Sequence, residues 1–138
     1  LVNAVAQLAR RMHGAGLHHQ DFYLTHLLLP AEAVGRMSSS VRLGGRARRS
    51  VLRAEDDGPA LHVIDLGRAR RRRRLSRRWI VKDLAQLNYS AAGVTRADRL
   101  RFVRAYLGRP IREDDRRLLA RIGRKTRAIA RHSRKNRL

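Results

Sequence analysis

The sequence predicts a mainly helical α+β fold, and two observations support this prediction. Apolar residues recur at helical spacing in residues 1–14 and again across residues 77–130. Two short apolar runs, Leu27–Leu29 and residues 61–67, are bounded by turn-forming residues, which is typical of short strands. The 138 residues contain no cysteine, which excludes disulfides and thiolate metal sites. A chain of this length can form one domain with a core of its own.

The N-terminal third predicts a helix, a loop and a strand. One face of the helix over residues 1–14 carries Leu1, Val5, Leu8 and Met12. Glycines at 14 and 16 end this helix. Residues 16–30 form a loop that leads into the leucine strand, which ends at Pro30. Residues 31–60 show little periodicity and are expected to be an irregular insert.

Three further helices are predicted after the strand at residues 61–67. Residues 77–91 form the first, and residues 96–107 form the second, which follows a capping box from Thr95 to Asp98. The third begins near Glu113–Asp115, where negative charge suits a helix N-terminus. Residues 131–138 are expected to be a frayed basic tail. The predicted buried positions are Leu100, Val103 and Leu107 in the second helix, and Leu118, Leu119, Ile122 and Ile129 in the third.

The formal net charge is +22, and arginine accounts for most of it. Arginine suits anions that present two oxygens, such as phosphate or carboxylate, so nucleic acid, anionic lipid and phosphorylated glycan are all candidate partners. A biased composition that places arginine on a solvated surface explains the same charge without any partner. No apolar run is long enough to cross a bilayer, and no signal-peptide pattern precedes the first helix.

Asp21, His26 and Asp65 form the constellation that could carry chemistry. An aspartate just before a short strand can take the proton of a substrate hydroxyl. A ligand five residues later and a second aspartate at the end of the next strand can hold a metal that bridges nucleotide phosphates. Gly67 is expected to let the backbone turn sharply after Asp65.

This order is the layout of protein kinases. The kinase catalytic loop reads H-R-D, four residues and N, and a metal-binding aspartate follows in D-F-G. In this chain His19-Gln20-Asp21 stands for H-R-D, His26 for the asparagine, and Asp65-Leu66-Gly67 for D-F-G.

Several longer stretches make the resemblance more specific. MHGAGLHHQDFYLTHLLL, IDLGRAR, RRWIVKDLAQLNYSA and TRADRLRFVRAYLG together resemble the lipopolysaccharide kinase family, whose members have a protein-kinase-like fold and phosphorylate heptose or Kdo of the lipopolysaccharide inner core. The resemblance spans most of residues 1–108, and residues 31–60 match poorly. It implies the C-terminal lobe of such a kinase, with a short β-hairpin that carries the catalytic loop and the D-x-G strand.

The resemblance implies a role for five residues. Asp21 would be the catalytic base, and His19 would brace its loop. Asp65 and His26 would bind Mg²⁺, and the helix residue Asp83 would hold the loop by hydrogen bonds to its amides. The implied cofactors are ATP and Mg²⁺. The implied partner is the lipopolysaccharide core glycolipid, reached from the cytoplasmic face of the bacterial inner membrane, where Arg70, Arg71, Arg72, Arg73 and Arg74 would bind anions.

Two departures from the kinase pattern matter. Gln20 replaces the arginine that pairs with an activation-loop phosphate in regulated protein kinases, which fits a glycan kinase without that switch. No Gly-rich phosphate loop, strand lysine or partner glutamate is found, and Lys82 is in the wrong place for that lysine. An N-terminal lobe is therefore expected to be missing, and the chain alone to be inactive or weakly active.

Three alternatives stay open at this point. His18, His19, His26, Asp21 and His62 could form a zinc site, although their spacing matches no known signature. A basic nucleic-acid-binding module is disfavoured, because the chain lacks a reader motif and has few aromatic residues for stacking. A catalytically inactive kinase-like remnant would retain the motifs without phosphotransfer.

Overall fold

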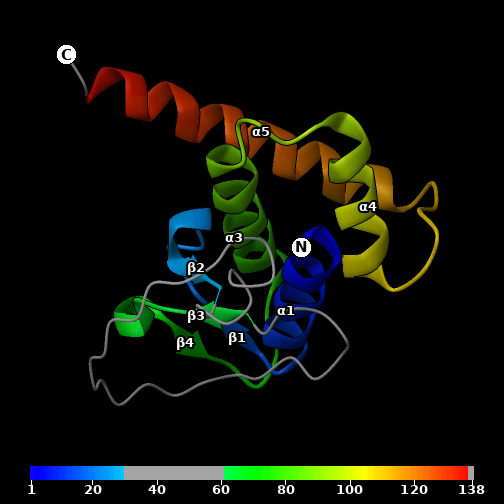
Figure 1. Cartoon of the computed structure of the whole chain (residues 1–138), viewed down its shortest axis with the longest axis horizontal. Helices are drawn as coiled ribbons and strands as arrows, with labels where there is room; N and C mark the ends of the chain where they lie inside the picture. The colour runs from blue at the N-terminus through cyan, green and yellow to red at the C-terminus, as the bar shows by residue number, and fades with distance from the viewer. Residues whose placement is uncertain (30–60, 137–138) are drawn as a thin grey trace, which may run out of the picture.

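The computed structural model describes residues 1–29 and 61–136, and α-helices dominate this part of the chain (Figure 1). The helices are α1 (Val2–Gly14), α3 (Arg77–Ser90), α4 (Arg96–Leu107) and α5 (Asp115–Lys135). The strands are β1 (Leu17–His18), β2 (Leu27–Leu28), β3 (His62–Val63) and β4 (Arg70–Arg71), with short 3₁₀ turns η1 (Leu24–His26) and η2 (Leu66–Arg68). The predicted insert at residues 31–60 lies outside the described residues.

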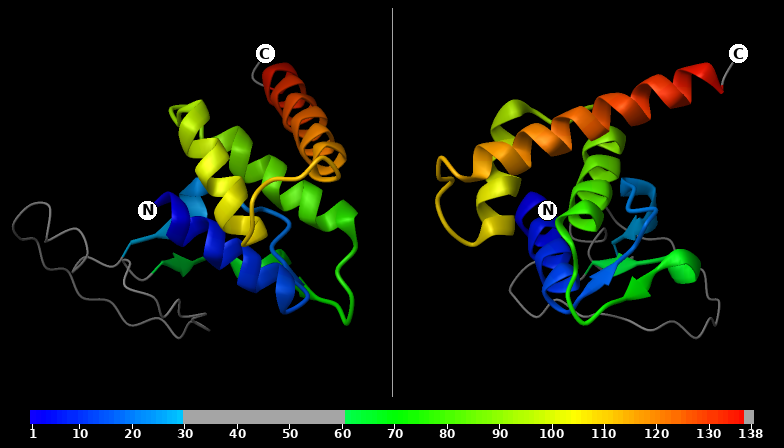
Figure 2. Two further views of the ribbon diagram at one scale, coloured as in Figure 1. Left: turned by 90° about the vertical axis from the view of Figure 1, so that its right-hand side faces the viewer. Right: turned by 180° about the vertical axis from the view of Figure 1, so that it is seen from behind.

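The helices pack as two pairs, α1 against α4 and α3 against α5. Figure 2 shows both pairs from two sides, with the C-terminal half of α5 extending beyond the other helices. The core between α1, α3 and the loop after β1 is formed by Val5, Leu8, Ala9, Met12, Phe22, Leu61, Leu84 and Leu87. Each large apolar side chain buried there contributes roughly 1.5–3 kcal/mol. This core fixes α1 and α3 against the loop that carries the candidate site.

The predicted helix boundaries are confirmed at several ends. The Thr95 hydroxyl accepts a hydrogen bond from the Asp98 amide (3.1 Å), as the capping box predicted. Gly108 ends α4 in the left-handed conformation (φ 65°). Helix α5 begins at Asp115, within the acidic segment expected to start it.

Three predictions about the helices are wrong. Helix α5 continues to Lys135, because arginine and lysine favour the helix and their charge complements its C-terminal dipole. Leu1 is 64% exposed, since it precedes the first turn of α1. Leu100 is 56% exposed, because α4 instead turns Phe102 and Tyr106 towards the core.

The strands form two short antiparallel pairs in place of the single predicted hairpin. β2 pairs with β3, with Leu27 opposite Val63, and β1 pairs with β4, with Leu17 opposite Arg71. The arginine run at residues 70–74 therefore starts with a strand, β4. The strand predicted over residues 61–67 is limited to His62–Val63, because Asp65 turns into the left-handed region and leads into η2. Both pairs lie beside α1 and α3 (Figure 1).

Gly16 makes the close approach of β1 and β4 possible. Its φ is 76°, and its carbonyl accepts a hydrogen bond from the Arg72 amide (2.8 Å). A Cβ at this position would overlap the carbonyl oxygen of Arg72, which is backbone and cannot move aside easily. At Gly108, also left-handed, a Cβ would meet only the end of the flexible Arg10 side chain.

We predict that Gly16→Ala destabilises the protein more than Gly108→Ala. Both substitutions place alanine in a left-handed conformation, at a cost of about 1–2 kcal/mol. Gly16→Ala adds an overpacking cost of about 1–3 kcal/mol. Urea unfolding followed by circular dichroism measures both, and Gly14→Ala is the control, because its Cβ would have no neighbour within 4 Å. Equal midpoints for Gly16→Ala and Gly108→Ala would contradict the predicted clash.

Candidate active site

The loop between β1 and β2 is anchored from below by the buried carboxylate of Asp83. This side chain has no exposed surface and lies in the middle of α3. Its two oxygens accept hydrogen bonds from the amides of His19 (2.7 Å) and Gln20 (2.9 Å). Bonds from backbone N–H groups to a carboxylate are stronger than neutral ones. The loop therefore has one defined position relative to α3, as the sequence predicted for Asp83.

Asp83 also ties the loop to two other helices. The His13 ring on α1 lies 3.3 Å from the Asp83 carboxylate through Nε2, which donates because a carboxylate only accepts. The other ring nitrogen, Nδ1, accepts from the phenol of Tyr106 on α4 (2.8 Å). The pKa of Tyr106 is raised, mainly by burial, so the phenol stays protonated and donates this hydrogen bond. The chain Tyr106–His13–Asp83 joins α4, α1 and α3 beneath the loop.

Gln20 adopts a left-handed backbone conformation at the centre of the loop, with φ of 72°. Such a conformation costs a non-glycine residue about 1–2 kcal/mol. The bond to Asp83 offsets this cost, and the Gln20 side chain donates to the carbonyl of Arg68 (2.8 Å). Among the described residues, the other non-glycine residue with positive φ is Asp65. The strained backbone thus lies at the two candidate catalytic segments, where functional sites store strain.

His19 braces the loop from within. Its Nε2 donates to the carbonyl of Ile64 (2.9 Å), the residue before Asp65, and its Nδ1 accepts from the Asp21 amide (3.3 Å). The ring is fully buried. One imidazole therefore connects the backbone at Asp21 to the backbone next to Asp65, which are distant in the sequence.

The Asp21 carboxylate is paired with Arg68. The guanidinium Nη1 lies 3.2 Å from Oδ1 and 3.0 Å from Oδ2 of Asp21. Arg68 follows directly after the D-x-G segment, in η2, and its own side chain is mostly exposed. Sequence reasoning did not assign a role to Arg68, although it is part of the I-D-L-x-R-A stretch.

His26 and Asp65 lie next to each other, as predicted. The Nδ1 of His26 donates to the Asp21 carbonyl (2.6 Å), so Nε2 carries the free lone pair, 3.8 Å from the Asp65 carboxylate. Asp65 is mostly exposed and offers the hard oxygen ligand that Mg²⁺ prefers, whereas an imidazole nitrogen is a softer ligand. Asp65 therefore offers a ligand of the kind that Mg²⁺ prefers, and the roles of Asp65 and His26 as metal ligands stay predictions.

The zinc-site interpretation of the histidines finds no support in the structure. Across residues 1–29 and 61–136, no three histidine, aspartate or glutamate side chains gather into a group that could hold a metal ion. His18 instead lies buried and stacked on Trp79, with its ring centroid 4.3 Å away.

Gly67 is less important than predicted. The left-handed turn falls at Asp65, and a Cβ at Gly67 would meet only an ordinary contact with the Asp65 side chain, at 3.8 Å. The arginines at 70–74 are all exposed, and Arg70 and Arg71 form β4. They follow η2 directly along the chain, and β4 pairs with β1, the strand that precedes the candidate loop.

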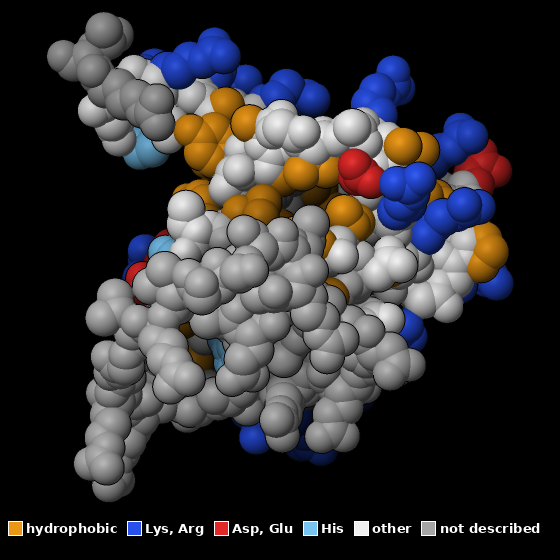
Figure 3. Space-filling model, viewed as in Figure 1, with side chains coloured by type: hydrophobic (Ala, Val, Ile, Leu, Met, Phe, Trp, Pro, Cys, Tyr) orange, Lys and Arg blue, Asp and Glu red, His pale blue; other side chains and the backbone are white. Residues whose placement is uncertain are grey.

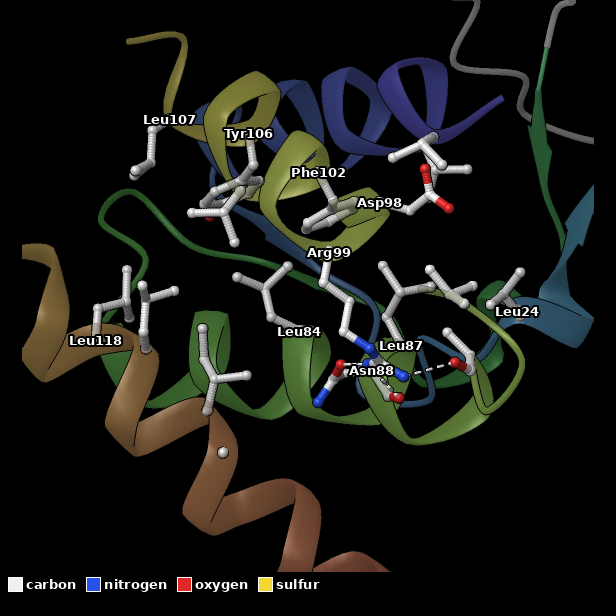
Figure 4. A pocket seen from close by; sticks show the side chains of 18 of the residues that line it. Leu24, Leu84, Leu87, Asn88, Asp98, Arg99, Phe102, Tyr106, Leu107 and Leu118 are labelled. Carbon is white, nitrogen blue, oxygen red and sulfur yellow. Dashed lines mark hydrogen bonds between the residues drawn. The ribbon is translucent and has the colours of Figure 1, made fainter. Parts of the chain in front are cut away.

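An apolar cavity of about 280 Å³ lies elsewhere, among α1, α3, α4 and α5 (Figure 4). Leu84, Leu87, Phe102 and Leu118 are among its lining residues, and Arg99 is hydrogen bonded to Asn88 at its edge. None of the candidate catalytic residues lines it. The cavity is therefore separate from the candidate active site.

Comparison with solved structures identifies the fold as that of a kinase-like protein. A structure described as WaaP in complex with acyl carrier protein matches 93% of this chain and 47% of that chain, with a TM-score of 0.67 and 40% identity. The family model of the lipopolysaccharide kinase (Kdo/WaaP) family matches residues 1–43 and 46–106. The chain belongs to this family.

Two curated relatives are both described as lipopolysaccharide core heptose(I) kinase WaaP. The protein from Pseudomonas aeruginosa is 40% identical over 115 residues, and that from Escherichia coli K12 is 36% identical over 115 residues. Each match covers 82% of this chain and 36% of the relative, so the chain spans about a third of the length of these proteins. Within the residues described, no helix has the length and apolar character needed to cross a membrane.

We predict that Asp83→Asn lowers the free energy of unfolding by about 2–4 kcal/mol, because an amide leaves one loop N–H facing another donor in a buried site. Chemical unfolding monitored by far-UV circular dichroism measures this loss. Asp98→Asn is the control, since Asp98 is a partly exposed carboxylate in the capping box of α4, where an amide oxygen can still accept the hydrogen bond from Thr95. A loss at Asp83 no larger than that at Asp98 would show that the buried carboxylate does not anchor the loop.

Proposed function

We propose that this chain is the catalytic lobe of a kinase that transfers the γ-phosphoryl group of ATP to a sugar hydroxyl, heptose or Kdo, of the lipopolysaccharide inner core. The observation that carries the proposal is the hydrogen-bonded frame around His19, which brings the Asp21 loop and the Asp65 segment together. Membership of the lipopolysaccharide kinase family supports the substrate class.

In this proposal, Asp21 accepts the proton of the acceptor hydroxyl. The sugar oxygen then forms a bond to the γ-phosphorus, and the bond between this phosphorus and the oxygen of ADP breaks. Arg68 holds the Asp21 carboxylate in place and would share it with the incoming hydroxyl. Such reactions depend mainly on positioning and on neutralisation of charge, which a rigid loop provides.

Asp65 would hold Mg²⁺, with His26 beside it, and the bound ion would neutralise the nucleotide phosphates. His26 is held for this role by its bond to the Asp21 carbonyl, so its Nε2 faces Asp65. The Asp83 carboxylate would act only through the loop, as a positioning residue.

The nucleotide would need a second lobe. The described residues contain the Asp21 and Asp65 segments, while the phosphate loop and strand lysine of kinases would come from an N-terminal lobe. We therefore propose that this chain has little or no activity without such a lobe. A catalytically inactive remnant is the alternative, and it predicts no phosphotransfer even when an N-terminal lobe is supplied.

We predict that Asp21→Asn and Asp65→Asn each abolish transfer in a protein that carries both lobes. Loss of a general base typically costs a factor of about 10²–10⁴ in rate. Transfer of radiolabelled phosphate from ATP to a lipopolysaccharide core acceptor measures the effect. Asp98→Asn, in the partly exposed capping box of α4, serves as the control and should retain activity. Full activity in Asp21→Asn would remove this residue as the base.

A binding competition tests the nucleic-acid alternative. In a competition experiment, duplex DNA at equal concentration should fail to displace a lipopolysaccharide core fragment from the protein. Displacement by DNA at the same concentration would favour a nucleic-acid-binding module over a glycan kinase.

We further propose that the exposed arginines at 70–74 hold the protein at the anionic surface of the inner membrane. Each basic residue near such a surface contributes about 1 kcal/mol. Replacement of all five by glutamine should weaken binding to vesicles containing anionic phospholipid at least tenfold, measured by co-sedimentation. Arg116, Arg117, Arg121, Arg124 and Arg127, replaced together on α5, give a control of equal charge. Unchanged vesicle binding in the first variant would exclude this segment as the anchor.

A further inference from the structure

Trp79 lies at the centre of a cluster of cations that the proposed phosphotransfer does not use. It is the single tryptophan of the chain and lies in the first turn of α3. The guanidinium carbons of Arg72 and Arg78 lie 5.7 and 5.4 Å from the ring centroid, and the Lys82 ammonium lies 5.8 Å from it. Trp79 and Lys82 both belong to the R-W-x-x-K-D-L stretch, of which only Asp83 has a role so far.

The indole of Trp79 is supported by a histidine of β1, the strand that precedes the catalytic loop. His18 on β1 stacks on Trp79 with an angle of 21° between the rings, and His18 is fully buried. Among the residues that the structure describes, neither nitrogen of the His18 ring has a hydrogen-bond partner. The pKa of His18 is lowered, mainly by burial, so the ring stays neutral and stacks as a flat surface against the indole. The stacking contact therefore fixes Trp79 relative to His18, which directly precedes His19.

The cations of this cluster have no ion-pair partner in the part of the chain that the structure describes. None of Arg72, Arg78 and Lys82 forms an ion pair or a side-chain hydrogen bond with any residue of the described ranges 1–29 and 61–136. Three like charges around one ring repel each other, and contact with the indole face offsets only part of this repulsion. The N-terminus of α3, one turn away, adds further positive potential. An anion would relieve this repulsion.

The cluster adjoins the loop that carries the proposed base. Lys82 directly precedes Asp83, whose carboxylate accepts hydrogen bonds from the loop amides of His19 (2.7 Å) and Gln20 (2.9 Å). Burial is the main cause that lowers the pKa of Lys82, and the charge of Asp21 acts in the opposite direction. Arg72 is held there as well, because its amide donates to the Gly16 carbonyl at the end of the β1–β4 pair.

We propose that Arg72, Arg78 and Lys82, arranged around Trp79, bind an anionic group of the acceptor glycolipid, a carboxylate or a phosphate, and so present a neighbouring sugar hydroxyl to Asp21. This inference rests on the proposed function and adds the feature by which the acceptor is chosen. Two guanidinium groups can bind an anion through pairs of oxygens, and the ammonium adds a compact charge.

The binding experiment uses Trp79 as its own reporter. The chain is titrated with an inner-core oligosaccharide that carries Kdo carboxylates, and tryptophan fluorescence is recorded, with calorimetry as an independent readout. We expect saturable binding that weakens at least tenfold when the carboxylates are reduced to alcohols. Inorganic phosphate in a parallel titration separates the two sources, because stronger competition by phosphate than by the free sugar acid assigns the anion to a phosphate. Equal affinity for the acidic and the reduced oligosaccharide, with no competition by phosphate, would overturn the inference.

Variants test the residues individually. Lys82→Gln and Arg78→Gln should each weaken oligosaccharide binding about five- to tenfold, and Lys82→Arg should restore most of it. Arg121→Gln, an exposed cation on α5 without a described partner, is the matched control and should leave binding within twofold. Thermal midpoints confirm that the variants fold. Native affinity in Lys82→Gln and Arg78→Gln alike would overturn the inference.

Kinetics separate this inference from the proposed function. In a protein with both lobes, Lys82→Gln should raise KM for the acceptor about tenfold and leave KM for ATP unchanged. Asp21→Asn should abolish transfer but keep the Trp79 fluorescence response. If Asp21→Asn stays active, the proposed base is wrong while the anion site stands. If Asp21→Asn is inactive and Lys82→Gln keeps the native acceptor KM, the anion site is wrong while the kinase assignment stands.

Discussion

The carboxylate of Asp83 is the interaction on which the candidate site depends. It is the point where α3 holds the loop amides of His19 and Gln20 and, through His13, holds α1. A buried charge is costly unless it is surrounded by donors, and here three donors converge on it. Because Gln20 adopts a conformation that a free chain avoids, the loop keeps its shape only while this carboxylate is in place.

The frame above Asp83 explains how residues far apart in the sequence become one site. The His19 ring is hydrogen bonded to the backbone of both segments, at the Asp21 amide and at the Ile64 carbonyl. His26 makes a second link between them, because its ring donates to the Asp21 carbonyl and its own carbonyl accepts from the Ile64 amide. The side chains proposed for chemistry are thus on short, strained segments, while His19 and Asp83, which hold these segments in place, are buried. A rigid support beneath accessible functional groups is what phosphotransfer by positioning requires.

The excess of arginine is distributed over distinct environments. Arg68 is paired with Asp21, Arg72 and Arg78 lie over the ring of Trp79, and Arg70, Arg71, Arg73 and Arg74 are exposed. Figure 3 shows a further set of basic side chains along the outer side of α5. Net charge alone could not distinguish these environments, because it describes association in general and says nothing about geometry.

The sequence by itself determined the helices, the core face of α1 and the two candidate aspartates, because helical periodicity, capping residues and kinase-like motif spacing are local signals. Asp83 was also predictable, since it lies in a motif. Only the tertiary structure decided the β1–β4 pair, the left-handed Asp65, the Arg68 contact and the cluster at Trp79. Each of these depends on segments that lie tens of residues apart, or on a backbone conformation that packing imposes against local preference, and a local pattern in the sequence carries no record of such contacts.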